Sequence, residues 1–308
     1  MIERVCVAGA GVIGSLYAAH LARQREVWVL TRREEHARAL NERGLRVSGR
    51  ADFHARLRAT AHAEALPDFD LGIVATKATE VDAVGARLAG RFPGAALMTV
   101  QNGLGAEEIL GRHGDWRLVS AVTFMSGTRH ADTHVEYILD TETWLGPDRG
   151  TPYEVVDETA RLIVDSGLKA RPFRDLRPAQ WSKLIFNATV NAVAALTGLP
   201  HDFHFAEEER LEHLGHLVRD LMDEGKAVAA AAGIDLHEDP WEMNVLATRR
   251  GSRHFPSMLE DVEARRPTEV DHITGALVRE AARLGVSVPL QEAMYRLVKA
   301  REASWTNR

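Results

Sequence analysis

Short apolar runs alternate with helical patterns through the first half of the chain. A short apolar run is typical of a buried strand, and apolar residues three or four positions apart are typical of a helix that buries one face. The predicted strands are residues 3–8, 27–30, 45–48, 54–59, 71–75, 95–100, 118–125, 135–139, 143–145 and 168–171, with a hairpin joining 45–48 to 54–59. The predicted helices are residues 16–23, 34–42, 79–91, 104–112 and 153–166. Such alternation predicts an open, mostly parallel sheet.

The pattern changes beyond Pro172, where strand alternation stops. Helical spacing then covers residues 178–199, 206–232, 240–248, 257–265, 268–285 and 289–303. We therefore predict an α/β domain with a Rossmann-type doubly wound sheet over residues 1–174. An all-helical C-terminal domain that carries substrate and catalysis is predicted over residues 175–308.

The first predicted strand leads into the first predicted helix through Gly9-Ala10-Gly11-Val12-Ile13-Gly14, which spells G-x-G-x-x-G. Three glycines at this spacing let a pyrophosphate approach the backbone and rest on the positive end of the helix. The motif alone is weak, because glycine-rich turns occur in many loops. The strand before it, the helix after it and the next strand at βαβ spacing favour a dinucleotide site over a tight turn without a ligand.

The residues after the second predicted strand bear on the choice of dinucleotide. An enzyme that uses NAD usually has Asp or Glu here to bind the ribose hydroxyls. This chain has Thr31-Arg32-Arg33. A guanidinium fits a 2′-phosphate in bidentate geometry, so we predict NADP, bound through Arg32 with support from Arg33. Solvated arginines at the start of a helix are the alternative.

Composition agrees with a cytoplasmic enzyme. The 308 residues suffice for two domains, and 38 basic against 44 acidic residues give a net charge of −6 with no basic block. Nucleic acid is therefore not an expected partner. We expect neither a cleavable signal peptide nor a membrane span. The single Cys6 excludes an internal disulfide and is interpreted as a small buried hydrophobe.

Fourteen histidines raise the question of a metal site. His201 with His204 and His213 with His216 have i, i+3 spacing, but no cysteine or carboxylate cluster completes a tetrahedral set. No metal is predicted. The oligomeric state is open, although exposed apolar faces of a helical domain could support a homodimer.

The helix that begins near Pro178 carries a polar row. Lys183, Asn187 and Asn191 recur every four residues, which places them on one side of a helix among apolar neighbours. An unsatisfied buried amide costs roughly 1 to 3 kcal/mol, so these groups need polar partners. A substrate and a nicotinamide ribose could supply them. A polar seam bonded to neighbouring backbone would do so equally well, and both interpretations stay open.

Several separate segments together resemble one family over essentially the whole chain. They are Gly9 to Gly14, Arg32, Thr76-Lys77, Gln101-Asn102-Gly103, Trp181 with Lys183, Asn187 and Asn191, Ser257 to Asp261, and Arg266 to Asp271. The chain resembles the ketopantoate reductases, which are NADP-dependent 2-dehydropantoate 2-reductases of pantothenate biosynthesis. Ordered matches of this kind are far more specific than a glycine motif.

The resemblance implies that Lys183 is the general acid, which protonates the 2-keto oxygen as hydride reaches the carbon. A positioned ammonium stabilises and then neutralises the charge on that oxygen, an effect typically worth about 10² to 10⁴ in rate. Burial beside other cationic groups would also lower the pKa of Lys183. A surface lysine with its ammonium in water is the alternative.

Further roles come from the same resemblance. Asn187 and Asn191 would orient the substrate, and Asn102 would contact cofactor and substrate, unless Asn102-Gly103 is only a turn. Lys77 would lie near the cofactor, unless it is a solvated loop lysine.

The last segments carry two more implied site residues. Ser257 would donate a hydrogen bond to the substrate carboxylate, and it also reads as a helix N-cap that forms a capping box with Glu260. Glu269 would accept a hydrogen bond from the substrate hydroxyl or help to organise the lysine. A carboxylate at a helix start is favoured by the dipole even without substrate. Asp261 is interpreted as structural.

The resemblance therefore implies an NADPH-dependent reductase of a 2-oxo acid, first of all ketopantoate to pantoate. A sibling reductase or dehydrogenase of another 2-oxo or 2-hydroxy acid is the alternative, and a non-catalytic dinucleotide-sensing protein is a third. Two departures bear on the substrate. Ala192 follows Asn191 where many relatives have proline, and the loop 248–256 is basic, with Arg249, Arg250, Arg253 and His254. This loop could attract a carboxylate or be a solvated bend.

Overall fold

The computed structural model describes residues 1–206, 212–249 and 255–306. The chain forms two compact units. The first comprises residues 1–101 and 106–176, and the second comprises residues 102–105 and the chain from residue 177. Each unit has its own hydrophobic core. The predicted fold class, a Rossmann-type α/β region followed by a helical region, is confirmed.

The main sheet of the first unit has eight strands in the order β12-β11-β8-β7-β6-β1-β2-β5. All neighbouring strands are parallel except β11, which runs antiparallel to β8. The strands are β1 (Arg4–Ala8), β2 (Glu26–Leu30), β5 (Arg58–Thr60), β6 (Leu71–Val74), β7 (Ala96–Thr99), β8 (Arg117–Val122), β11 (Thr143–Pro147) and β12 (Ala170–Pro172). The prediction of a mostly parallel sheet therefore holds.

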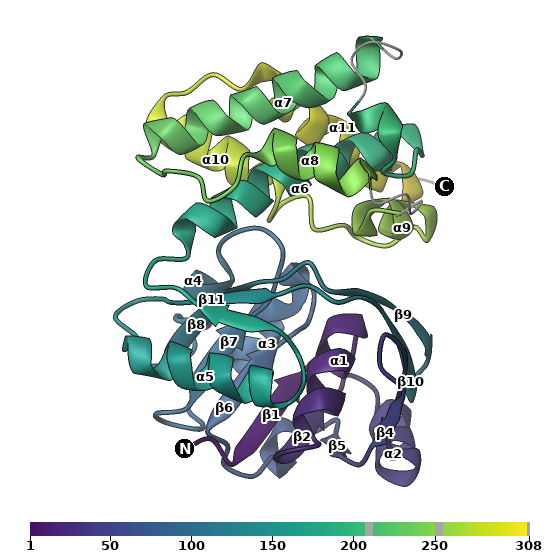
Figure 1. Ribbon diagram of the computed structural model, residues 1–308, viewed down its shortest axis with the longest axis vertical. Coiled ribbons are helices and arrows are strands. Elements are labelled where there is room, and N and C mark those ends of the chain that lie inside the picture. The colour runs from purple at the N-terminus through teal and green to yellow at the C-terminus, as the bar shows by residue number, and fades with distance from the viewer. Residues whose placement is uncertain (207–211, 250–254, 307–308) are drawn as a thin grey trace. The chain divides into compact units, whose positions relative to one another are not determined.

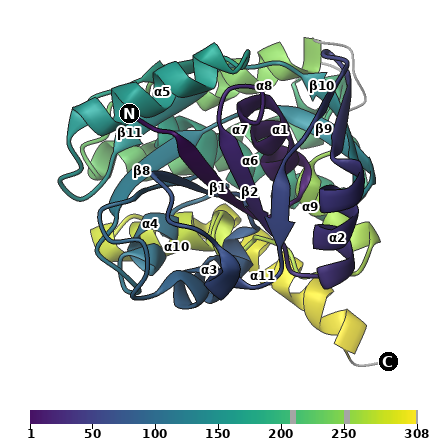
Figure 2. The same ribbon diagram turned by 90° about the horizontal axis from the view of Figure 1, so that it is seen from below.

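Helices cover both faces of this sheet (Figures 1 and 2). Helices α1 (Val12–Leu21) and α5 (Tyr153–Asp165) lie on one face, and α3 (Val81–Leu88) and α4 (Ala106–Leu110) lie on the other. The short helix η1 (Ala63–Ala65) leads to β6, η2 (Ala78–Glu80) leads into α3, and α2 (Glu34–Arg43) follows β2. With both faces buried, the strands can be continuous apolar runs rather than alternating ones.

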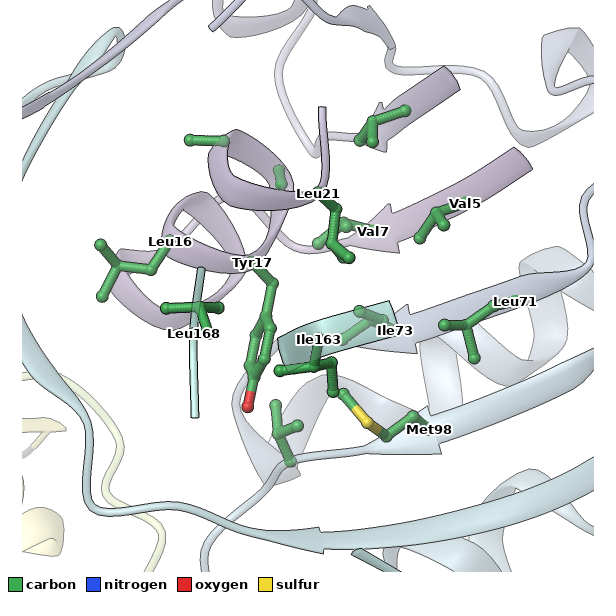
Figure 3. Close-up of a cluster of buried hydrophobic side chains, with 14 of the residues drawn as sticks. Val5, Val7, Leu16, Tyr17, Leu21, Leu71, Ile73, Met98, Ile163 and Leu168 are labelled. Carbon is green, nitrogen blue, oxygen red and sulfur yellow. The ribbon is translucent and has the colours of Figure 1, made fainter. Parts of the chain in front are cut away.

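Side chains of β1 alternate between two cores because successive strand residues point to opposite faces. Val5 and Val7 join the cluster under α1, which Figure 3 shows together with Tyr17. The Tyr17 hydroxyl shares a hydrogen bond of 2.7 Å with the Thr143 hydroxyl, so this buried phenol has a polar partner. Cys6 joins the core on the other face, where burial raises the pKa of its thiol to about 12. This agrees with the interpretation of Cys6 as a buried hydrophobe.

A smaller sheet corrects two predictions. Its order is β4-β3-β10-β9, with β3 (Leu45–Gly49), β4 (Phe53–Ala55), β9 (Ser126–Ala131) and β10 (His134–Leu139). The predicted hairpin partner 54–59 is wrong in part, because it divides into β4 and β5, and β5 pairs with β2 in the main sheet. Strand β9 was not predicted, since its residues are polar and mostly exposed and give no apolar alternation.

The second unit is a group of helices around α6 (Arg177–Thr197). Helix α6 packs against α7 (Glu212–Ala231), α8 (Pro240–Arg249), α9 (Ser257–Glu263), α10 (Thr274–Leu284) and α11 (Pro289–Thr306), and η3 (Phe203–Phe205) packs against α7 and α8 (Figure 1). Most of α6 is buried, which explains why it is apolar around most of its circumference. Of the predicted basic loop, Arg250, Arg253 and His254 lie outside the described residues. No helix in the described ranges is long and apolar enough to cross a membrane.

Candidate active site

The glycine turn after β1 is closed by backbone contacts that only glycine permits. Gly9 has a φ of +106°, and a Cβ there would lie 2.8 Å from the backbone nitrogen of Thr76. A Cβ on Gly14 would overlap the carbonyl oxygen of Gly9. The first and third glycines therefore allow the turn to pack against the chain that leaves β6 and allow α1 to start immediately behind it.

Gly11 differs from these two glycines because a Cβ there would meet nothing within 4 Å. Gly11 is the N-cap residue of α1, without a side-chain hydrogen bond, and the first turn of α1 has no acidic residue. The first N–H groups of a helix have no intrahelical acceptor. The start of α1 therefore offers donors, open space and a positive dipole end to an anion, while Ala10, Val12 and Ile13 pack against the core.

The chain after β6 completes this region. The Thr76 hydroxyl is buried and has no hydrogen-bond partner among the described residues. The Gln101 side-chain nitrogen donates to the carbonyl oxygens of Val74 at 2.8 Å and Thr76 at 2.9 Å, which fixes the backbone beside Gly9. Lys77 follows as the half-buried N-cap residue of η2. The glycine turn has open space at Gly11, and the Thr76 hydroxyl close to the turn has no hydrogen-bond partner among the described residues. This combination fits a polar, phosphate-bearing ligand such as a dinucleotide.

The two arginines after β2 have different partners. Arg32 pairs with Glu80 at 3.0 Å, and its side chain is 81 % exposed. Arg33 donates to both carboxylate oxygens of Asp132 at 2.7 Å. The Arg129 guanidinium lies 4.0 Å from the same carboxylate, and the His36 ring shares a hydrogen bond of 2.8 Å with the backbone carbonyl of Asp132, so Asp132 is held in place. Arg32 is therefore the arginine that is free to turn towards a ligand by giving up only an exposed ion pair, while Arg33 is fixed.

In the second unit, Lys183 is buried beside Glu269. Both residues are only 9 % exposed, which excludes the alternative of a surface lysine. Burial lowers the pKa of Lys183 to about 8, and the Glu269 carboxylate opposes this by raising it. From the sequence, we attribute a lowered pKa of Lys183 to burial beside other cationic groups. Burial is indeed the cause, but the charged neighbour is the carboxylate of Glu269 and not a cation.

The asparagines of α6 share its polar row with Lys183. Asn187 donates to the side-chain oxygen of Asn102 at 3.4 Å, and the Asn191 oxygen accepts from the backbone nitrogen of Met258 at 3.4 Å. A carboxamide has two donor hydrogens and an acceptor oxygen with two lone pairs, so each long bond uses only part of its capacity. The asparagines of the row therefore have partners within the protein, as a polar seam would, and they still have donors and acceptors available for a ligand.

The loop that carries Asn102 is anchored to the segment before α10. Gly103 has a φ of +90°, and a Cβ there would overlap the carbonyl oxygen of His272. The Leu104 nitrogen donates to the same oxygen at 3.1 Å. His272 was not singled out from the sequence. Burial lowers the pKa of its imidazole, while Glu269 and Asp271 raise it.

The structure corrects the expected surroundings of Glu269. The predicted helix 268–285 begins only at Thr274, so Glu269 does not lie at a helix start. Instead, the Thr268 nitrogen and hydroxyl donate to Glu302 of α11 at 2.8 and 2.7 Å, and the Val270 nitrogen donates to the Thr268 hydroxyl at 3.2 Å. These bonds hold both neighbours of Glu269, and nothing in the local sequence pattern indicates them.

Ser257 and Asp261 lie on α9, which packs against α6. Ser257 is exposed, and the N-cap residue of α9 is Pro256, with no side-chain cap bond, so the predicted capping box with Glu260 is wrong. Ser257 occupies the first helical position because Pro256 already has an extended conformation before the helix. Asp261 is buried and pairs with Arg266 at 3.1 Å, as its structural interpretation predicts.

Two of the histidines considered as metal ligands have other partners. The His201 ring shares a hydrogen bond of 2.8 Å with Asn244, and His204 contacts Asp202. Across residues 1–206, 212–249 and 255–306, no group of three His, Cys, Asp or Glu side chains is arranged to hold a metal ion.

Comparison with known proteins identifies the family of both units. Residues 5–150 match the family model described as ketopantoate reductase PanE/ApbA, and residues 175–302 match its C-terminal counterpart. A 2-dehydropantoate 2-reductase of Archaeoglobus fulgidus is 28 % identical over 98 % of this chain and 99 % of its own.

Solved structures agree with the sequence comparison. A PanE/ApbA family ketopantoate reductase from Ralstonia eutropha JMP134 superposes with a TM-score of 0.88 at 26 % identity, covering 99 % of this chain and 100 % of the other. A D-mandelate dehydrogenase in complex with NADH and anilino(oxo)acetate has a TM-score of 0.87 at 22 % identity over 99 % and 100 % of the two chains, and shows the same fold. Because the two family models together span nearly the whole sequence, the chain belongs to the ketopantoate reductase family of oxidoreductases.

Proposed function

We propose that this protein reduces a 2-oxo acid with NADPH and that ketopantoate, which becomes pantoate, is its substrate. The observation that carries the proposal is the buried Lys183 with its lowered pKa, next to Glu269 and in one row with Asn187 and Asn191. A buried ammonium that can lose its proton near neutral pH suits a general acid. The names of the relatives in this family support the same reaction.

Lys183 donates the proton in this proposal. When the keto carbon accepts hydride, its oxygen gains negative charge, and the Lys183 ammonium stabilises that charge and then transfers a proton to give the hydroxyl. Glu269 keeps Lys183 protonated in the resting protein, because it raises a pKa that burial alone would lower further. The carboxamides of Asn102, Asn187 and Asn191 hydrogen-bond the polar groups of the substrate and orient the carbonyl. Ser257 donates to the substrate carboxylate.

The first unit would hold the dinucleotide. The N–H groups at the start of α1 would bind the pyrophosphate, Arg32 would bind the 2′-phosphate, and Lys77 would contribute to the same site. NADPH supplies the hydride when it is bound. Arg32→Ala is expected to weaken NADP⁺ at least about tenfold more than NAD⁺, because a charge-assisted bond to phosphate is lost. If calorimetric titrations show that Arg32→Ala lowers the affinity for NADP⁺ and NAD⁺ equally, Arg32 does not bind the 2′-phosphate.

The substrate is tested by following NADPH oxidation with ketopantoate and a panel of linear, branched and aromatic 2-oxo acids. We expect the highest kcat/KM for ketopantoate. Efficient reduction of another acid with poor reduction of ketopantoate would support a sibling reductase instead. If the protein binds NADPH but reduces none of the acids, the result would support the alternative of a non-catalytic dinucleotide-sensing protein.

The homodimer is also part of the proposal. Phe203, Leu246 and Leu297 of the second unit are large apolar side chains that are about half exposed. Side chains of this kind favour association with a second copy where they form one contiguous patch. Sedimentation velocity over a range of protein concentrations tests this, and a monomer throughout the micromolar range would contradict it.

A further inference from the structure

Arg32 and Glu80 form an ion pair that joins the segments after β2 and β6, the two strands on either side of β1. Arg32 follows β2, Glu80 ends the short helix η2 after β6, and β1 lies between β2 and β6 in the sheet. The carboxyl ends of parallel strands lie at one edge, which is also where Gly9 begins its turn. Arg32 Nη1 is 3.0 Å from Glu80 Oε1. The carboxylate therefore lies directly beside the guanidinium proposed to hold the 2′-phosphate.

The two charges at this position act on a ligand in opposite directions. A 2′-phosphate carries close to two negative charges and would compete with the Glu80 carboxylate for the donors of Arg32. It would also be repelled by Glu80 if that carboxylate remained in place. The ribose of NAD has a free 2′-hydroxyl there, and a carboxylate can accept a hydrogen bond from it.

The second arginine does not relieve this competition. Arg33 is bound through both oxygens of Asp132 at 2.7 Å, so its charge is already matched. Each arginine after β2 thus faces a carboxylate from another segment of the same unit. The Arg32 pair is the more exposed of the two, at 81 % and 45 % for its side chains against 48 % and 29 % for Arg33 and Asp132, and it can open when a ligand arrives.

We infer that Glu80 is a cofactor-specificity residue, which competes with the 2′-phosphate for Arg32 and thereby reduces the preference of this protein for NADP over NAD. The inference deepens the proposed function and rests on its assignment of Arg32. The inference concerns the ratio of the affinities for NADP and NAD. The residues after the second strand give no indication of Glu80, because it lies 48 residues from Arg32 in the sequence.

The experiment measures dissociation constants of NADP⁺ and NAD⁺ by calorimetry at low ionic strength, where surface charges are least screened. In Glu80→Gln, the ratio of the NAD⁺ constant to the NADP⁺ constant should rise at least about threefold, the size of one exposed charge interaction. Glu80→Asp keeps the charge and should stay close to the unmodified protein. Added salt at about 0.5 M should reduce the difference.

Glu26→Gln is the matched control. Glu26 pairs with Arg4 at 3.0 Å and is 41 % exposed, but the pair lies at the amino ends of β1 and β2, at the opposite edge of the sheet. Its removal should leave the ratio unchanged. An unchanged or lower ratio in Glu80→Gln, or an equal rise in Glu26→Gln, would overturn the inference.

The binding data also separate this inference from the proposed function. If the unmodified protein binds NADP⁺ and Arg32→Ala weakens it, the proposed cofactor site holds, and an unchanged ratio in Glu80→Gln refutes only the role of Glu80. If the unmodified protein binds neither dinucleotide, the proposed function fails and this inference fails with it.

Discussion

The two units use different parts of the chain for chemistry. In the first unit, the candidate pyrophosphate position is built from backbone, with glycines that let the turn close and leave N–H groups open at the start of α1. In the second unit, the candidate proton donor is a side chain whose properties depend on a carboxylate 86 positions away, Glu269, and on burial within the helices.

This difference indicates which changes should affect binding and which should affect chemistry. A backbone site tolerates no added Cβ where the chain passes close to itself. A buried ammonium responds to every nearby change of charge or hydration. Substitutions in the first unit should therefore alter dinucleotide affinity, and those in the second unit should alter turnover and its dependence on pH.

The largest effect is expected for Lys183→Ala. Loss of the proton donor should lower kcat by at least about a hundredfold, while the dissociation constant of NADP⁺ stays within about twofold. Stopped-flow turnover and calorimetry measure the two quantities. Lys226→Ala is the control, because this lysine is on α7 and pairs with Asp223 and Asp239. Near-normal turnover in Lys183→Ala would eliminate it as the acid.

A matched pair of glycine substitutions tests the first unit next. Gly11→Ala meets open space and should change the free energy of unfolding little, but its Cβ should weaken NADP⁺ about tenfold by obstructing the pyrophosphate. Gly14→Ala should instead lower the free energy of unfolding by about 1 to 3 kcal/mol, since its Cβ would overlap the Gly9 carbonyl. Urea denaturation and calorimetry distinguish the two, and a reversal of this pattern would refute the assigned roles.

The sequence predicts the candidate site of the first unit more fully than that of the second unit. The strand, glycine turn and helix around Gly9 are contiguous, so a short window of sequence holds the whole arrangement. Lys183, Asn187 and Asn191 were placed on one helix side by their spacing alone. Their partners Asn102 and Glu269 are far away in the sequence, and only the resemblance to a family connected them.

The errors have physical causes in long-range bonds. The helix at Glu269 was predicted to start too early because Thr268 reads as a helix-start residue, whereas its nitrogen and hydroxyl both bind Glu302 on α11. The segment 54–59 reads as one strand, but β4 and β5 pair with different sheets. Pairing partners such as these are decided by tertiary contacts that local patterns do not contain.

A smaller effect is expected for Glu269→Gln, and it has a definite sign. Lys183 must be protonated to act, so kcat should fall as the pH rises through its pKa of about 8. Glu269 raises that pKa, so removing its charge should lower it and move the falling limb by about one pH unit towards acid. A pH profile of kcat measures this. A limb that stays in place, or moves towards higher pH, would contradict the proposed pairing.

The smallest effect concerns the bonds that hold the neighbours of Glu269. Glu302→Ala removes the acceptor for the Thr268 nitrogen and hydroxyl, so the segment 268–270 should loosen and Glu269 should restrain Lys183 less well. We expect kcat to fall a few-fold and its falling limb to move in the same direction as in Glu269→Gln, by less. Glu302→Gln keeps an acceptor oxygen and should largely preserve both. Glu292→Ala, which breaks an exposed pair with Arg296 on the same helix, controls for α11 itself. If Glu302→Ala changes only the free energy of unfolding and leaves the pH profile in place, these bonds stabilise the fold without positioning the carboxylate.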